Sequence, residues 1–78
     1  MDIKILGSGC ANCRNLEAAT RQALAELALD AEIDKVTDPA EIASWGVMST
    51  PALVIDDDVV LVGRVPKLDD LKALIARR

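Results

Sequence analysis

Aromatic side chains are almost absent from this 78-residue sequence, which contains no Phe and no Tyr and has Trp45 as its single aromatic residue. Proteins that bind single-stranded nucleic acid stack the bases on aromatic side chains, so this class fits poorly. Positive charge is also scarce, because nine Lys and Arg residues face thirteen Asp and Glu residues and leave a net charge of -4. Without a basic surface, the chain is equally unsuited to binding a phosphate backbone.

Long apolar segments are lacking too, since no hydrophobic run approaches the roughly 20 residues that a transmembrane helix needs. The first residues, Met1-Asp2-Ile3, pass directly into an apolar stretch, and we therefore expect no signal peptide. We also expect a cytoplasmic location without membrane attachment. In that compartment, two cysteines are more often catalytic, redox-sensing or metal-binding than a structural crosslink.

Apolar residues nevertheless make up 51% of the chain, and most of them are Leu, Ile, Val and Ala. This composition is typical of a globular α/β domain and not of a disordered chain. The length suits one domain, which we expect to span residues 1–78. Its core must be built from aliphatic side chains.

Hydrophobic spacing predicts seven elements in the order β-α-β-α-β-β-α. The first two strands are separated by a helix, which predicts a parallel pair with a right-handed crossover. The last two strands read as an antiparallel hairpin, so the four strands form a mixed sheet. The strands are predicted at residues 3–6, 31–36, 52–55 and 59–62, and the helices at 11–28, 39–45 and 67–76.

Both cysteines of the chain, Cys10 and Cys13, lie where the first strand gives way to the first helix. The first turn of a helix carries unpaired N–H groups and the positive end of the helix dipole, which together stabilise a thiolate. Such a pair permits a reversible disulfide. The spacing alone also fits a site for a soft metal ion, or cysteines without any joint role.

Two other functions therefore stand beside a redox role: a carrier of Cu(I) or zinc, and a non-catalytic domain that binds a partner. The carrier is less well supported. Small copper-binding domains with a similar cysteine pair end in a strand, whereas this chain ends in an amphipathic helix, and Ser8 stands where those domains have Met.

Two segments together resemble the thioredoxin superfamily in its minimal form, the small thioredoxin- or glutaredoxin-like redox-active disulfide proteins. They are Gly7-Ser8-Gly9-Cys10-Ala11-Asn12-Cys13 and Gly46-Val47-Met48-Ser49-Thr50-Pro51-Ala52-Leu53. The resemblance implies a thioredoxin-like three-layer fold and a protein disulfide oxidoreductase that works without a metal or a cofactor. It further implies that Cys10 is the nucleophile and Cys13 the resolving thiol of a dithiol–disulfide cycle.

The same resemblance implies a cis peptide bond between Thr50 and Pro51, beside the cysteines. Thr50 and Pro51 would then bind an extended substrate through main-chain hydrogen bonds. Met48 either borders that substrate groove or fills a gap in the core. The expected partners are protein disulfides and an electron donor, either glutathione or an enzyme like thioredoxin reductase. The residues expected to tune the cysteine pair are Gly9, Ala11 and Asn12.

The sequence departs from full-length thioredoxins in two places. Those proteins carry a buried carboxylate on the strand that leads into the active site, but the corresponding strand here, Ile3-Lys4-Ile5-Leu6, has no acid. Water or Lys4 would therefore have to accept the proton of Cys13. The residue before Cys10 is Gly9 where thioredoxins have Trp, which predicts a more open site. We interpret Arg14 as a solvated helix residue and Trp45 as a packing residue.

Overall fold

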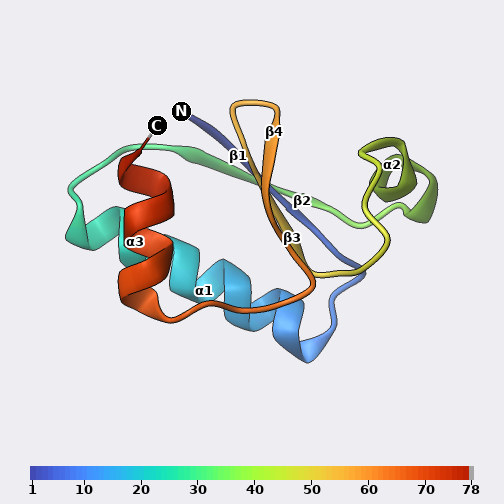
Figure 1. The fold of residues 1–78 in the computed structure, drawn as a ribbon, viewed down its shortest axis with the longest axis horizontal. Coiled ribbons are helices and arrows are strands. Elements are labelled where there is room, and N and C mark those ends of the chain that lie inside the picture. Colours follow the sequence, from blue (N-terminus) through green and yellow to red (C-terminus); the bar gives the residue numbers. More distant parts are fainter. Residues whose placement is uncertain (78) are drawn as a thin grey trace.

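The computed structural model describes residues 1–77 and contains the seven predicted elements in the predicted order (Figure 1). Within those residues, no helix is both long enough and apolar enough to cross a membrane. The strands are β1 (Asp2–Leu6), β2 (Glu32–Val36), β3 (Ala52–Ile55) and β4 (Asp58–Val62), and the helices are α1 (Ala11–Glu26), α2 (Pro39–Ser44) and α3 (Leu68–Ala76).

The four strands form one mixed sheet in the order β2-β1-β3-β4. Strand β1 runs parallel to β2 and antiparallel to β3, and β3 pairs with β4 as a hairpin. The predicted parallel crossover and hairpin are thus confirmed. In the parallel pair, Ile5 is in register with Lys35, which places their side chains on the same face of the sheet.

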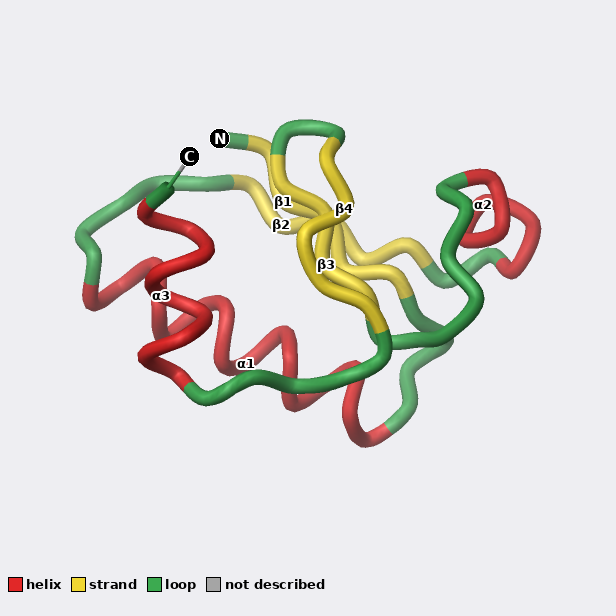
Figure 2. Tube along the Cα trace, viewed as in Figure 1, coloured by secondary structure: helices red, strands yellow, loops and turns green. Residues whose placement is uncertain are grey.

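Helices α1 and α3 cover one face of this sheet, and α2 lies on the other, which gives the expected three layers (Figure 2). The larger core lies under α1 and α3. Lys72 of α3 also reaches Glu26 of α1, with 3.0 Å between Nζ and Oε1. The buried members of this core are Ile3, Ile5, Leu16, Ala23, Leu24, Leu53, Ile55, Leu61, Leu71 and Ile75.

The core under α2 is smaller. Asp38 caps this short helix by accepting the N–H of Ala40 at 3.2 Å, and Pro39 occupies its first position. Trp45 is half-buried against this core, as its interpretation as a packing residue requires. The buried members are Leu6, Val36, Ile42, Ala52 and Val54.

Helix α1 ends at Glu26, two residues before the predicted end at Ala28. Ala28 has a φ angle of 55°, so the backbone turns there into the left-handed region. The N–H of Leu29 then donates to the Leu24 carbonyl at 3.0 Å, which closes the helix. The sequence hides this end because the left-handed position carries Ala instead of the usual Gly.

The β3–β4 hairpin turns on Asp56 and Asp57, whose φ angles are 49° and 68°. Two consecutive left-handed residues are the geometry of a two-residue hairpin turn, for which Asp is among the favoured side chains. The predicted turn is therefore present, and β4 begins one residue early, at Asp58. This turn lies at the end of the sheet opposite the cysteines (Figure 1).

Candidate active site

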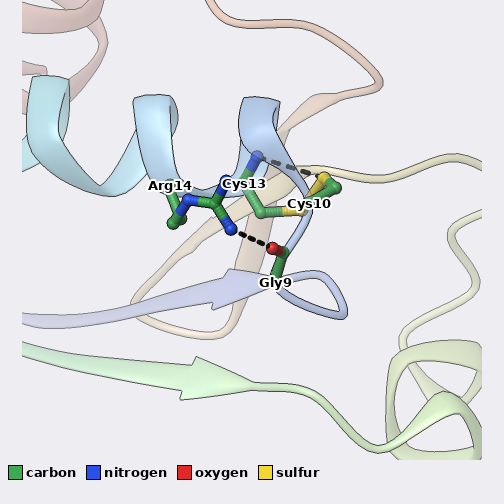
Figure 3. Close-up of a disulfide and its surroundings, with 4 residues drawn as sticks. All are labelled: Gly9, Cys10, Cys13 and Arg14. Carbon is green, nitrogen blue, oxygen red and sulfur yellow. Dashed lines mark hydrogen bonds between the residues drawn. A yellow bond between two sulfur atoms is a disulfide. The ribbon is translucent and has the colours of Figure 1, made fainter.

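The two cysteines sit at the start of α1, directly after the turn that follows β1, and they form a disulfide (Figure 3). Their Cα atoms are 5.0 Å apart. Cys10 is the N-cap residue of the helix, and its Sγ accepts the backbone N–H of Cys13 at 3.2 Å. The first sulfur therefore occupies the place where a helix terminus favours negative charge.

The environments of the two sulfurs differ. Cys10 is exposed, whereas Cys13 is only 5% exposed and lies one turn inside the helix. Only Cys10 is accessible to a large reaction partner. Cys13 is shielded from such a partner but lies within bonding distance of Cys10.

Gly7 holds the buried sulfur close to the sheet. A Cβ at this position would overlap Cys13 Sγ, and it would lie 3.8 Å from Thr50 Cβ. Only a residue without a side chain lets Cys13 approach β1 this closely, whereas the distance to Thr50 would be an ordinary van der Waals contact. This role of Gly7 depends on packing against Cys13 that no local sequence pattern reveals.

The Thr50–Pro51 peptide bond is cis, in agreement with the resemblance described above. Pro51 is buried, and its carbonyl accepts the N–H of Gly63 at 2.7 Å. Thr50 is exposed, and within residues 1–77 its backbone N–H and C=O take part in no hydrogen bond. Among residues 1–77, nothing competes with a substrate for those two groups.

Met48 is 96% exposed, so the alternative that it fills a gap in the core is wrong. It lines a hollow of about 280 Å³ together with Thr50 and with Ser8, which belongs to the turn at residues 7–9 before Cys10, called the cysteine turn below. Apolar side chains form much of the remaining wall, including Ile42 and Val47. The structure thus brings Met48, Thr50 and the cysteine turn to one surface.

Arg14 is an exposed helix residue, as interpreted from the sequence, and it also makes a contact at the site. Its Nη1 donates to the carbonyl of Gly9 at 2.7 Å, which ties the cysteine turn to the first turn of α1 (Figure 3). Gly9 itself has a φ angle of 88°, a conformation that suits glycine. The other two residues expected to tune the pair, Ala11 and Asn12, are exposed in the first turn of α1.

The suggestion that Lys4 accepts the proton of Cys13 is wrong. Lys4 is on the α2 face, where its Nζ lies 2.8 Å from Asp2 Oδ2 and 5.8 Å from the centre of the Trp45 ring. The hydrogen bond to Asp2 raises the pKa of Lys4 above its ordinary value. Cys13 lies on the opposite, α1 side of the sheet, so the two groups are separated by the sheet itself.

A cavity of about 190 Å³ adjoins Cys13 on the α1 face. Glu17 of α1 lines it, with Oε1 at 3.6 Å from Lys35 Nζ and Oε2 at 3.0 Å from Arg21 Nη2. The hydrogen bond from Arg21, followed by the charge of Lys35, holds the pKa of Glu17 below its ordinary value. The lining residues are Ile5, Gly7, Gly9, Cys13, Arg14, Glu17, Lys35 and Thr37.

The sequence did contain a signal for this cavity. Glu17 follows Cys13 by four residues and so shares its helix face. Lys35 alternates with Glu32, Asp34 and Val36 along its strand, as Ile33 does. The sequence did not indicate on which side of the sheet α1 packs, and so it did not show that Glu17 and Lys35 meet beside Cys13.

Comparison with known proteins agrees with this geometry. Residues 1–76 match the family model described as "Thioredoxin domain". The chain is 37% identical over 76 residues to a thioredoxin of Methanothermobacter thermautotrophicus, which covers 97% of this chain and 99% of that protein. It is 43% identical over 70 residues to a thioredoxin of Methanocaldococcus jannaschii, with coverage of 90% and 80%.

These similarities extend over nearly the whole chain and include both cysteines within the matched family region. A disulfide at a helix start, with Cys10 exposed and Cys13 buried, suits thiol–disulfide exchange, because an accessible thiolate can attack and a second thiol lies beside it. The redox interpretation is therefore favoured over the soft-metal carrier and the non-catalytic domain. The chain belongs to the thioredoxin family and is a thiol–disulfide oxidoreductase.

Proposed function

We propose that Cys10 is the attacking thiolate and Cys13 the resolving thiol in the reduction of protein disulfides. The observation that carries this assignment is the difference in exposure, with Cys10 open to solvent and Cys13 5% exposed. The N-cap position adds to it, because the helix terminus stabilises negative charge on the Cys10 sulfur.

In the first step, the Cys10 thiolate attacks one sulfur of a substrate disulfide. A bond forms between Cys10 Sγ and that sulfur, and the other substrate sulfur leaves as a thiolate. Cys13 then loses its proton and attacks Cys10 Sγ. The intramolecular disulfide forms, the bond to the substrate breaks, and the substrate is released with both sulfurs reduced while the cysteine pair is oxidised.

The substrate would lie across the surface shared by Thr50, Pro51 and Met48. The free backbone groups of Thr50 can pair with an extended peptide in the manner of an added strand. The hollow beside Met48 offers an apolar wall for a neighbouring substrate side chain. The flexible Met side chain suits partners of different shapes, since it adapts easily to irregular surfaces.

As a thioredoxin-like enzyme, the protein acts on protein disulfides and needs a partner that returns it to the dithiol form. We propose an enzyme like thioredoxin reductase or glutathione as this electron donor. A reducing cycle needs a compartment that supplies electrons, which favours the cytoplasm.

Single-cysteine variants test these roles. With a disulfide-bonded protein substrate such as insulin, Cys13→Ser is expected to accumulate a mixed disulfide through Cys10, because the resolving thiol is missing. Cys10→Ser is expected to lose the reductase activity and to form no such adduct. Ser at position 10 can still cap α1, so the helix start is preserved.

Mass spectrometry of the trapped species and circular dichroism of both variants provide the readout and the folding control. An adduct through Cys13 in the Cys10→Ser variant, or full reductase activity of that variant, would contradict the assignment.

A further inference from the structure

A charged pair beside Cys13, formed by Glu17 and Lys35, has no part in the mechanism described so far. Both residues line the cavity of about 190 Å³ that Cys13 also lines. Glu17 lies one helical turn beyond Cys13, so the two side chains share a face of α1. The Glu17 side chain is 19% exposed, and its Oε1 lies 3.6 Å from Lys35 Nζ.

Among the described residues that line this cavity, Glu17 is the one carboxylate. Strand β1 contributes only Ile5, and Gly7 beyond it has no side chain. Arg14 brings a positive charge, but its guanidinium is held at the Gly9 carbonyl. The negative charge near Cys13 therefore comes from the helix and not from the strand.

This charge is present near neutral pH. The hydrogen bond from Arg21 and the charge of Lys35 keep the pKa of Glu17 below its ordinary value of 4.5. Coulomb interactions at a partly shielded site are several-fold stronger than in bulk water. The charged groups that face the Cys13 side of the cavity, or pair with those that do, are Arg14, Glu17, Arg21 and Lys35.

We propose that Glu17 and Lys35 are positioning residues whose opposed charges set how readily Cys13 loses its proton. The carboxylate disfavours a second negative charge at Cys13 and keeps the proton there while Cys10 reacts. Lys35 acts in the opposite direction and limits this effect. The inference rests on the proposed role of Cys13 as the resolving thiol.

The resolving step then follows a defined course. The Cys13 proton passes to water in the cavity, which is large enough for several molecules at about 30 Å³ each. The new thiolate attacks Cys10 Sγ, the Cys10–Cys13 bond forms, and the bond from Cys10 to the substrate breaks. The electron pair of that bond stays on the substrate sulfur, which takes a proton from water.

The test measures Cys13 by itself, in the Cys10→Ser background, through its rate of alkylation by iodoacetamide as a function of pH. Glu17→Gln is expected to move the midpoint to lower pH, and Lys35→Met to higher pH. At a fixed pH below the midpoint, each rate should differ about three- to tenfold from the parent, in opposite directions.

Two variants control this experiment. Glu26→Gln removes the other α1 carboxylate that pairs with a lysine, Lys72, and should leave the midpoint unchanged because Glu26 does not line the cavity. Glu17→Asp keeps the charge and should restore most of the parental midpoint. Shifts of Glu17→Gln and Lys35→Met in the same direction would overturn the proposal, and so would a Glu17→Gln midpoint equal to that of Glu26→Gln.

A second measurement uses the chain with both cysteines and follows the decay of the mixed disulfide against pH. Its pH profile should move in the same direction as the alkylation midpoint for each variant. Decay profiles that stay fixed while the midpoints move would overturn the catalytic part of the inference. The alkylation result does not depend on substrate turnover, so failure of the assigned cysteine roles would be seen separately, as an adduct on the wrong cysteine.

Discussion

The two faces of the sheet support different parts of the active site with cores of different size. Under α1 and α3, the apolar core contains ten buried residues among those described, and this face also holds the buried Cys13 and its charged cavity. Under α2, the apolar core contains five buried residues, and this face adjoins the hollow beside Met48 and Thr50. Cys13 thus lies on the face with the larger core, while the proposed substrate surface borders the face with the smaller core.

The largest expected effect compares one core substitution on each face. Leu16→Ala, in the fully buried core under α1, should lower the free energy of unfolding by about 3 kcal/mol. Ile42→Ala, at 9% exposure under α2, should cost about 2 kcal/mol, because the smaller core can relax around the loss. Urea denaturation at neutral pH measures both values.

Hydrogen exchange sharpens the same comparison. In the Ile42→Ala variant, the amides of α2 should lose protection before those of α1, since a short helix over a small core can open locally. Equal loss of protection in α1 and α2 would show that the two layers unfold as one unit and that the proposed difference between them is absent.

We expect a smaller effect in the pH dependence of stability on the α1/α3 face, at acid pH. The hydrogen bond from Lys72, then that from Gln22, lowers the pKa of Glu26 below its ordinary value of 4.5. The carboxylate therefore stabilises the fold above that pH, and this stabilisation is lost as the pH falls through the lower, folded-state value. The melting temperature of Glu26→Gln should lie below that of the parent at pH 7, and the difference should shrink below pH 4.5.

The comparison for that experiment is Asp69→Asn, on an exposed carboxylate in the first turn of α3. This variant tests whether removing an exposed carboxylate without a lysine partner among the described residues changes the melting temperature at pH 7 as Glu26→Gln does. A difference for Glu26→Gln that stays constant between pH 4.5 and pH 3 would show that the ion pair with Lys72 contributes nothing.

We expect the smallest effect in the pH dependence of stability on the α2 face, at alkaline pH. The Asp2 hydrogen bond raises the pKa of Lys4 above 10.5, so the charged amine stabilises the fold below that pH. This contribution is lost as the pH rises through the folded-state value. The melting temperature of Lys4→Met should be slightly lower than that of the parent at pH 8, and the two should converge above pH 10.5.

Lys67 supplies the matched control for the alkaline experiment, because its side chain is exposed and makes no hydrogen bond or ion pair within residues 1–77. Lys67→Met should match the parent at both pH values. If Lys4→Met also matches the parent at pH 8, the contacts with Asp2 and Trp45 do not stabilise this face.

The order of the elements and the place of the cysteines could be predicted because both depend on local patterns. Period-two and helical spacing fixed the strands and helices to within one or two residues. Asp38 and Pro39 marked the start of α2 through capping preferences that act over a few residues. The turn at Asp56 and Asp57 was likewise visible in its composition.

The charges around Cys13 could not be predicted because they depend on which side of the sheet each helix packs. Lys4 and Lys35 both lie on strands beside the site, but alternation sends Lys4 toward α2 and Lys35 toward α1. The contact between Gly7 and Cys13 joins two elements in three dimensions. The left-handed Ala28 at the end of α1 breaks the usual preference for Gly, so composition concealed it.

The disulfide joins residues only three positions apart, so it closes a very short loop of the chain. A crosslink over so few residues removes little conformational entropy from the unfolded chain, in contrast to one that closes a long loop. A thermodynamic cycle links the four states, folded and unfolded, oxidised and reduced. The difference in folding free energy between the oxidised and reduced forms therefore equals the difference in the free energy of reducing the disulfide between the folded and the unfolded chain. Its sign shows which oxidation state the fold favours.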